Sequence, residues 1–156
     1  MSWMIAMPGI KEALQRVPSL PIVKNEPHVL IGWPTAKVND VLVFFWFDRA
    51  VRADTLQMVN NDYIVGIRVC VPWQDNSRAE EQIAPFVNTI PAVFDRNLQD
   101  SDGHSYATLG GRVRWARITD VRSGDTDGFV NIGGTDTRSI LFELTVTEDA
   151  PLGAGL

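Results

Sequence analysis

A run of seven apolar residues, Val41–Phe47, restricts the possible folds more than any other feature of this sequence. The run is Val-Leu-Val-Phe-Phe-Trp-Phe, and its β-branched and aromatic side chains favour a strand. Because successive side chains of a strand point to opposite faces, this strand is apolar on both faces and needs a cover on each. We expect a helix of the same chain on one face. On the other face we expect either a neighbouring subunit or the chain's own core.

The length and charge of the chain narrow the class of protein. With 156 residues it has the size of one domain. We expect a single α+β domain over residues 1–148, followed by a flexible tail over residues 149–156. The net charge of −5 argues against tight, non-specific binding to nucleic acid. The lone cysteine, Cys70, excludes an intramolecular disulfide and is expected to be a buried thiol. No apolar stretch reaches the roughly 20 residues that span a bilayer, so no membrane partner is expected.

Two helices are predicted, and the second is broken. Residues Pro8–Val17 place apolar side chains at helical spacing, and prolines stand near the start and just after the end. Ser77 and Glu80 form a capping box, which marks the start of a longer helical pattern. Pro85 and Pro91 lie inside that pattern, and each removes a backbone donor. We therefore expect this helix to be kinked or split.

Several other segments are predicted to be strands. Tyr63–Val71 alternates along its length, with Pro72 directly after it. Arg112–Val121 changes its alternation near Ala116, which predicts a bulge. Phe129–Ile132 and Arg138–Glu148 are expected to form a hairpin around a pair of glycines.

The segment Asp48–Asp62 is polar and irregular and contains the turn signal Asn60-Asn61-Asp62, so we expect a long loop with a short strand at most. The whole pattern predicts an α+β fold: a mixed, mostly antiparallel sheet with two helices packed on one face. The predicted core joins strand residues to helical residues that cover them. The strand residues are Val65, Ile67, Val69, Ile140, Phe142 and Leu144, and the helical ones are Ile83, Phe86, Val87, Ile90 and Phe94.

No pattern in the sequence predicts catalytic or metal chemistry. His28 and His104, with one cysteine, are too few to form a zinc site. Asp100-x-Asp102-Gly103 begins like a calcium loop, but Gly111 stands where the closing glutamate should be. His104 also lies near Ser105 and two aspartates, although a hydrolytic triad draws its members from separate elements. We therefore expect no catalytic residue, no cofactor and no metal, and hence no enzyme.

The order of elements over Pro8–Glu148 resembles that of the tail terminator, or tail-completion, proteins of long-tailed bacteriophages. Five segments carry the resemblance: a helix ending Arg16-Val17-Pro18, the strand Tyr63–Val69, the helix Ala79–Val87, the strand Gly111–Ala116, and the last hairpin from Ile132–Thr135 to Leu144–Val146. The resemblance implies a small α+β domain that assembles into a hexameric ring and closes the tail tube beneath the head. It carries no catalytic residues.

These expectations define a structural protein of the virion, at the head–tail junction. Its expected partners are copies of itself, the tail tube protein and a head-completion or neck protein, while DNA passes through the lumen without specific binding. The apolar run and the long loops are the expected contacts between subunits. The candidate interface residues are Phe45, Trp46, Phe47, Arg49, Arg52, Asp100 and Asp102. The alternatives are another head–tail connector or neck component, or, in a different class, a small-molecule-binding or enzymatic α+β domain.

Overall fold

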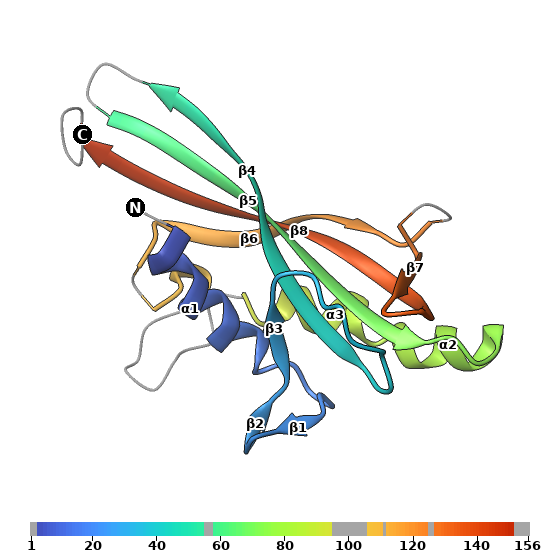
Figure 1. Ribbon diagram of the computed structural model, residues 1–156. Coiled ribbons are helices and arrows are strands. Elements are labelled where there is room, and N and C mark those ends of the chain that lie inside the picture. The colour runs from blue at the N-terminus through green and yellow to red at the C-terminus, as the bar shows by residue number, and fades with distance from the viewer. Residues whose placement is uncertain (1–2, 55–57, 95–105, 111, 125–126, 152–156) are drawn as a thin grey trace.

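The apolar run forms the first part of a long strand, β4 (Leu42–Asp54), within a six-stranded sheet (Figure 1). The computed structural model describes residues 3–54, 58–94, 106–110, 112–124 and 127–151. In the sheet, β4 is parallel to β3 (Val29–Ile31) and antiparallel to β5 (Met58–Pro72). On the far side of β5, β8 (Thr135–Pro151) pairs with β5 and also with β6 (Trp115–Arg122) and β7 (Phe129–Ile132).

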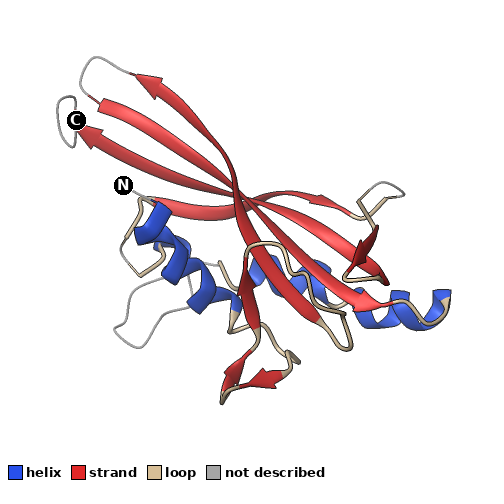
Figure 2. Ribbon diagram, in the orientation of Figure 1, coloured by secondary structure: helices blue, strands red, loops and turns tan. Residues whose placement is uncertain are grey.

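The helices lie on one face of this sheet (Figure 2). They are α1 (Trp3–Leu14), α2 (Asn76–Ile83) and α3 (Phe86–Ala92), with a short 3-10 helix, η1 (Tyr106–Thr108), and a separate small hairpin of β1 (Ile22–Val23) and β2 (Glu26–Pro27). Only β3 and β4 are parallel among the described strand pairs. The predicted α+β class, with a mixed and mostly antiparallel sheet, is confirmed.

The main core lies between the sheet and the helices, largely as predicted. All six predicted strand residues are buried, and so are Ile83, Phe86, Ile90 and Phe94. Val87 was also predicted to be buried in this core. That prediction is wrong, because 42% of Val87 is exposed. The break at Pro85 explains the difference. The helix restarts as α3 at Phe86, and burial of Phe86 and Ile90 turns the next position toward solvent.

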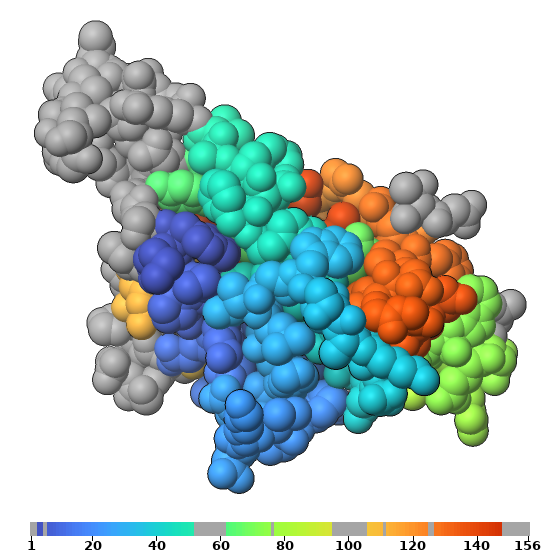
Figure 3. All heavy atoms as spheres, in the orientation of Figure 1, coloured from blue at the N-terminus to red at the C-terminus, as the bar shows by residue number. Residues whose placement is uncertain are grey.

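The second face of the apolar run is covered by the chain itself. Residues 33–41, here called the strap, cross this outer face. Val38 packs there with Leu42, Phe44 and Cys70 in a smaller apolar cluster. The Val38 amide donates a hydrogen bond of 3.3 Å to the Thr135 hydroxyl. In Figure 3 the strap lies against the β7–β8 hairpin, so the chain's own core, not a neighbouring subunit, covers this part of the run.

The β7–β8 hairpin turns on two glycines with positive φ, Gly133 at 58° and Gly134 at 82°. This is the geometry of a two-residue type I′ turn, which suits the twist of the paired strands. Gly133 also lies so close to the Ala36 backbone that a Cβ there would overlap it. The predicted hairpin is confirmed, and its turn supports the strap.

Two helix starts differ from the prediction. Helix α1 begins at Trp3 rather than at Pro8, and Pro8 lies inside it. The extra turn is held by Trp3, whose ring lies 6.0 Å from Phe45 and 5.7 Å from Phe47. The N-cap of α2 is Asp75 and not Ser77, since the Asp75 carboxylate accepts the Arg78 amide at 2.9 Å. The predicted split at Pro85 is confirmed, because α2 ends at Ile83 and α3 starts after that proline.

The long loop predicted over Asp48–Asp62 is wrong. Strand β4 continues to Asp54, and β5 begins at Met58. From its first residues β5 pairs with β4 on one side and with β8 on the other. Pairing on both sides outweighs the weak strand propensity of the polar residues in this segment. The predicted bulge in β6 exists, but it lies between Ile118 and Asp120 instead of near Ala116.

The C-terminal end also differs from the prediction. Strand β8 runs to Pro151, so residues 149–151 of the predicted flexible tail belong to the sheet. Residues 152–156 lie outside the described part of the chain.

Candidate assembly interface

The most distinctive feature of the molecule is an arm formed by the ends of three strands. It consists of residues 48–54 of β4, 58–62 of β5 and 148–151 of β8. Strand β6 starts opposite Thr147, in line with Asp62 and Val51, so it flanks only the base of the arm. Figure 2 shows the arm projecting past the described helices, which cover neither of its faces. The seven residues of β4 in the arm span roughly 23 Å along the strand.

A β-bulge between Phe47 and Arg49 marks the base of the arm and decides which predicted interface residues reach the surface. Phe45 is fully buried against the helices, so its assignment to an interface is corrected. Phe47 points to the same face but is 41% exposed, since it lies beyond most of α1. Trp46 and Arg49 lie on the outer face of the sheet, where Trp46 is partly buried and Arg49 is exposed.

The other three predicted interface residues are not placed by the structure. The backbone of Arg52 pairs with Asn61 in the arm, but its side chain lies outside the described part of the molecule. Asp100 and Asp102 lie entirely outside the described residues.

A row of alternating charges crosses the outer face at the base of the arm. Arg49 pairs with Asp48 and also lies 3.8 Å from a Glu143 oxygen. Arg122 approaches the same carboxylate at 3.5 Å and binds Asp120 through Nε at 2.6 Å. Its hydrogen bond to Asp120, together with the charges of Asp120 and Glu143, raises the pKa of the Arg122 guanidinium. This charge row joins strands β4, β8 and β6.

The floor beneath the charge row is apolar and shaped around Gly66. A groove of about 200 Å³ is lined by Trp46, Asp48, Arg49, Ile64, Gly66, Arg122, Leu141 and Glu143. The indole of Trp46 lies over Gly66, its cross-strand partner. A Cβ at position 66 would lie 2.8 Å from Trp46 Cη2 and closer still to Cε2 and Cζ2. The groove therefore depends on a glycine at this position, a requirement that the sequence pattern did not reveal.

An aromatic cluster extends from the groove to the strap. The ring of Trp33 lies 5.0 Å from both Phe44 and Trp46, and half of Trp33 is exposed. Beneath it, the buried Arg68 guanidinium lies 5.5 Å from the Trp33 ring and donates to Asp127 O at 2.6 Å and to Ser139 Oγ at 2.7 Å. Burial lowers the pKa of Arg68. The cluster fixes the strap in place and leaves one large aromatic surface open.

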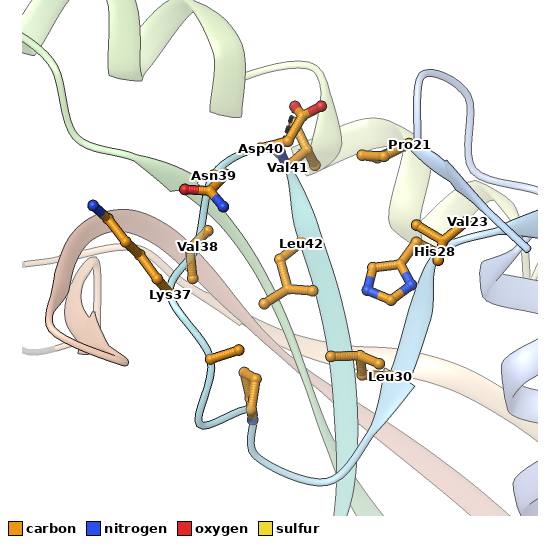
Figure 4. A pocket seen from close by; sticks show the side chains of 12 residues that line it. Pro21, Val23, His28, Leu30, Lys37, Val38, Asn39, Asp40, Val41 and Leu42 are labelled. Atoms are coloured by element: carbon orange, nitrogen blue, oxygen red, sulfur yellow. Dashed lines mark hydrogen bonds between the residues drawn. The ribbon is translucent and has the colours of Figure 1, made fainter.

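At the other end of β4 lies an apolar hollow, here called the base pocket (Figure 4). Its volume is about 280 Å³, and its walls come from the β1–β3 region and from the strap. Leu30 and Leu42 line its inner part, while His28 and Lys37 stand on opposite sides (Figure 4). Asp40 also lies at the pocket, and its carboxylate accepts a hydrogen bond of 2.7 Å from the Val41 amide.

The groups that carry chemistry in most enzymes are dispersed in this fold. Among the described residues there is no group of three or more histidine, cysteine, aspartate or glutamate side chains placed to hold a metal. Cys70 is buried, and burial raises the pKa of its thiol to about 11, as expected of a structural cysteine. His28 borders the base pocket, and His104 lies outside the described residues. No helix in the described part of the chain is long and apolar enough to cross a membrane.

Comparisons with known proteins leave the family open. No protein-family model matches the sequence, and no curated protein matches it significantly.

Proposed function

We propose that this chain is a structural subunit of a bacteriophage particle, a tail terminator that forms a ring, closes the tail tube and joins it to the head or neck. The arm is the observation that supports this proposal most. Strands become stable in water when an apolar face packs against further strands or a covering layer. A projecting arm of three strands gains that layer when it lies on another subunit.

The side chains at the base of the arm support the same proposal. Phe47 and Val51 are 41% and 49% exposed on opposite faces of β4. Large apolar side chains exposed next to a charged row are typical of protein interfaces with an apolar centre and a polar rim. The proposed partners are further copies of the chain, six in a ring, together with the tail tube protein and a neck protein.

The net charge of −5 supports a lumen whose surface binds DNA only weakly. In the proposed ring, an acidic surplus faces the lumen and DNA slides through without specific contacts. The proposal gives the chain no enzymatic role and no cofactor.

Native mass spectrometry tests the proposal, on the chain alone and mixed with tail tube protein. We expect masses at multiples of the monomer, with six copies in the mixture. Val51→Asp should abolish these multiples and leave the far-ultraviolet circular dichroism unchanged. Val121→Asp is the matched control, because Val121 is 41% exposed but lies on β6, away from the arm. A monomer under both conditions would refute the proposed function.

The base pocket favours a second candidate function, a small-molecule-binding domain. At about 280 Å³ it is close to the lower limit of known ligand pockets, and it combines apolar walls with a few polar groups. This candidate predicts a monomer that retains a small-molecule adduct in the same native mass spectra.

A further inference from the structure

The arm and the base pocket lie at opposite ends of one strand. The pocket is lined by Leu42, the first residue of β4, and the arm ends at Asp54, the last. Twelve residue steps at about 3.3 Å place these ends about 40 Å apart. The arm therefore cannot reach the pocket of its own chain, whereas it can reach the pocket of another copy.

The two surfaces also match in polarity. Apolar residues line much of the pocket, among them Leu30, Leu42 and Pro34, and the arm exposes Val51. An apolar side chain entering such a hollow removes apolar surface from water on both partners, which favours the contact.

Charge favours the same pairing. The arm carries an acidic surplus, with two arginines, Arg49 and Arg52, against five acids: Asp48, Asp54, Asp62, Glu148 and Asp149. Lys37 stands at the edge of the pocket and Lys24 in the adjacent β1–β2 turn, both exposed. Neither lysine forms an ion pair with any residue in the described part of the chain. An acidic arm is attracted to this free positive charge.

We infer that the base pocket receives the arm of a second copy of this chain, with Val51 of the arm near Leu42 and Lys37 of the pocket. The inference rests on the proposed function and identifies the contact by which the ring closes. The two surfaces are different patches on one chain, so each copy uses its arm on one neighbour and its pocket on the other. Such a heterologous contact repeats around a ring.

Cysteine cross-linking tests this contact directly. One preparation carries Val51→Cys and a second carries Lys37→Cys, and the two are mixed and treated with a short bismaleimide. We expect a covalent dimer that contains one chain of each kind, at a yield at least tenfold above either variant alone. Both positions are exposed, so neither change threatens the fold, and the native thiol, Cys70, is buried.

Arg117→Cys is the matched control for Lys37→Cys. Arg117 is also exposed, but it lies on β6, at the opposite edge of the sheet from β3. Cross-linking of Val51→Cys to Arg117→Cys, or to itself, in preference to Lys37→Cys would overturn the inferred contact. If the chain assembles in native mass spectra but the Val51–Lys37 product stays at the control level, the inferred contact fails and the proposed function stands. If the chain never assembles, the proposed function fails, and the inferred contact fails with it.

Discussion

Gly66→Ala tests the packing that forms the outer groove. A methyl group at position 66 would overlap the indole of Trp46, whose Cη2 would be 2.8 Å away and whose Cε2 and Cζ2 would be closer. Trp46 has little freedom to move, because its ring also packs against Trp33 at 5.0 Å and Phe44 at 5.6 Å. Overpacking of this kind costs about 1–3 kcal/mol, so we expect Gly66→Ala to lower the free energy of unfolding by that amount.

The same change should reverse its sign when Trp46 is already removed. In a Trp46→Ala background the clash is absent, and what remains is the intrinsic cost of glycine in a strand. Replacing glycine with alanine there should raise the free energy of unfolding by about 0.5–1 kcal/mol. Urea unfolding followed by far-ultraviolet circular dichroism, applied to the native chain, both single variants and the double variant, gives the four free energies of the cycle.

Gly124→Ala is the control for a general effect of removing glycine. A Cβ added at Gly124 would meet no atom within 4 Å, and φ at this residue is not positive, so this change should be neutral or slightly stabilising. A Gly66→Ala variant as stable as the native chain, or equal losses with and without Trp46, would refute the packing argument.

Three further predictions concern the core, a helix cap and the buried thiol, each measured by urea unfolding. Phe142→Ala should cost about 3–5 kcal/mol because its side chain is fully buried. Val87→Ala, at an exposed position of α3, should change the free energy of unfolding by no more than about 0.5 kcal/mol, and similar losses in the two variants would contradict the assigned core. Asp75→Ala should cost about 1 kcal/mol and Ser77→Ala much less, because the Asp75 carboxylate accepts the hydrogen bond from the Arg78 amide. A larger loss for Ser77→Ala would show that Ser77 is the N-cap, as the capping box predicted. Burial raises the pKa of Cys70 from 9.0 to about 11, so the unfolded chain loses this proton first and stability should fall as pH rises from about 9 to 11; Cys70→Ala should remove that slope.

Burial could be predicted from the sequence where the pattern of a single strand or helix distinguishes its buried face from its exposed face. Ile140, Phe142 and Leu144 alternate with more polar residues, so their burial could be predicted without knowing the neighbours of β8. The break at Pro85 was also predictable, because a missing amide is a local property. The length of β5 was not, because Met58–Asp62 lies between β4, which is close in sequence, and the end of β8, which is far away in sequence.

The interface was only partly predictable for a similar reason. The run Val41–Phe47 shows that two faces need covers, but not that the strap supplies one of them. Phe45 and Phe47 have the same chemistry and face the same way. Only the position of α1 makes the first a core residue and the second half exposed. The charge row depends on β8 and β6 lying beside β4 and β5, and no local pattern in the sequence encodes that order.

The strap has a consequence for how the chain is made. Its anchor joins Val38 to the Thr135 hydroxyl, 97 residues later in the sequence. Until that part of the chain leaves the ribosome, Phe44 and its apolar neighbours on the outer face of β4 stay open to water. Contacts between residues so far apart in sequence form slowly. Apolar strands that stay exposed before these contacts form are prone to aggregate. Expression at low temperature, or with chaperones that shield such strands, should therefore raise the yield of folded protein more than any change to the finished surface.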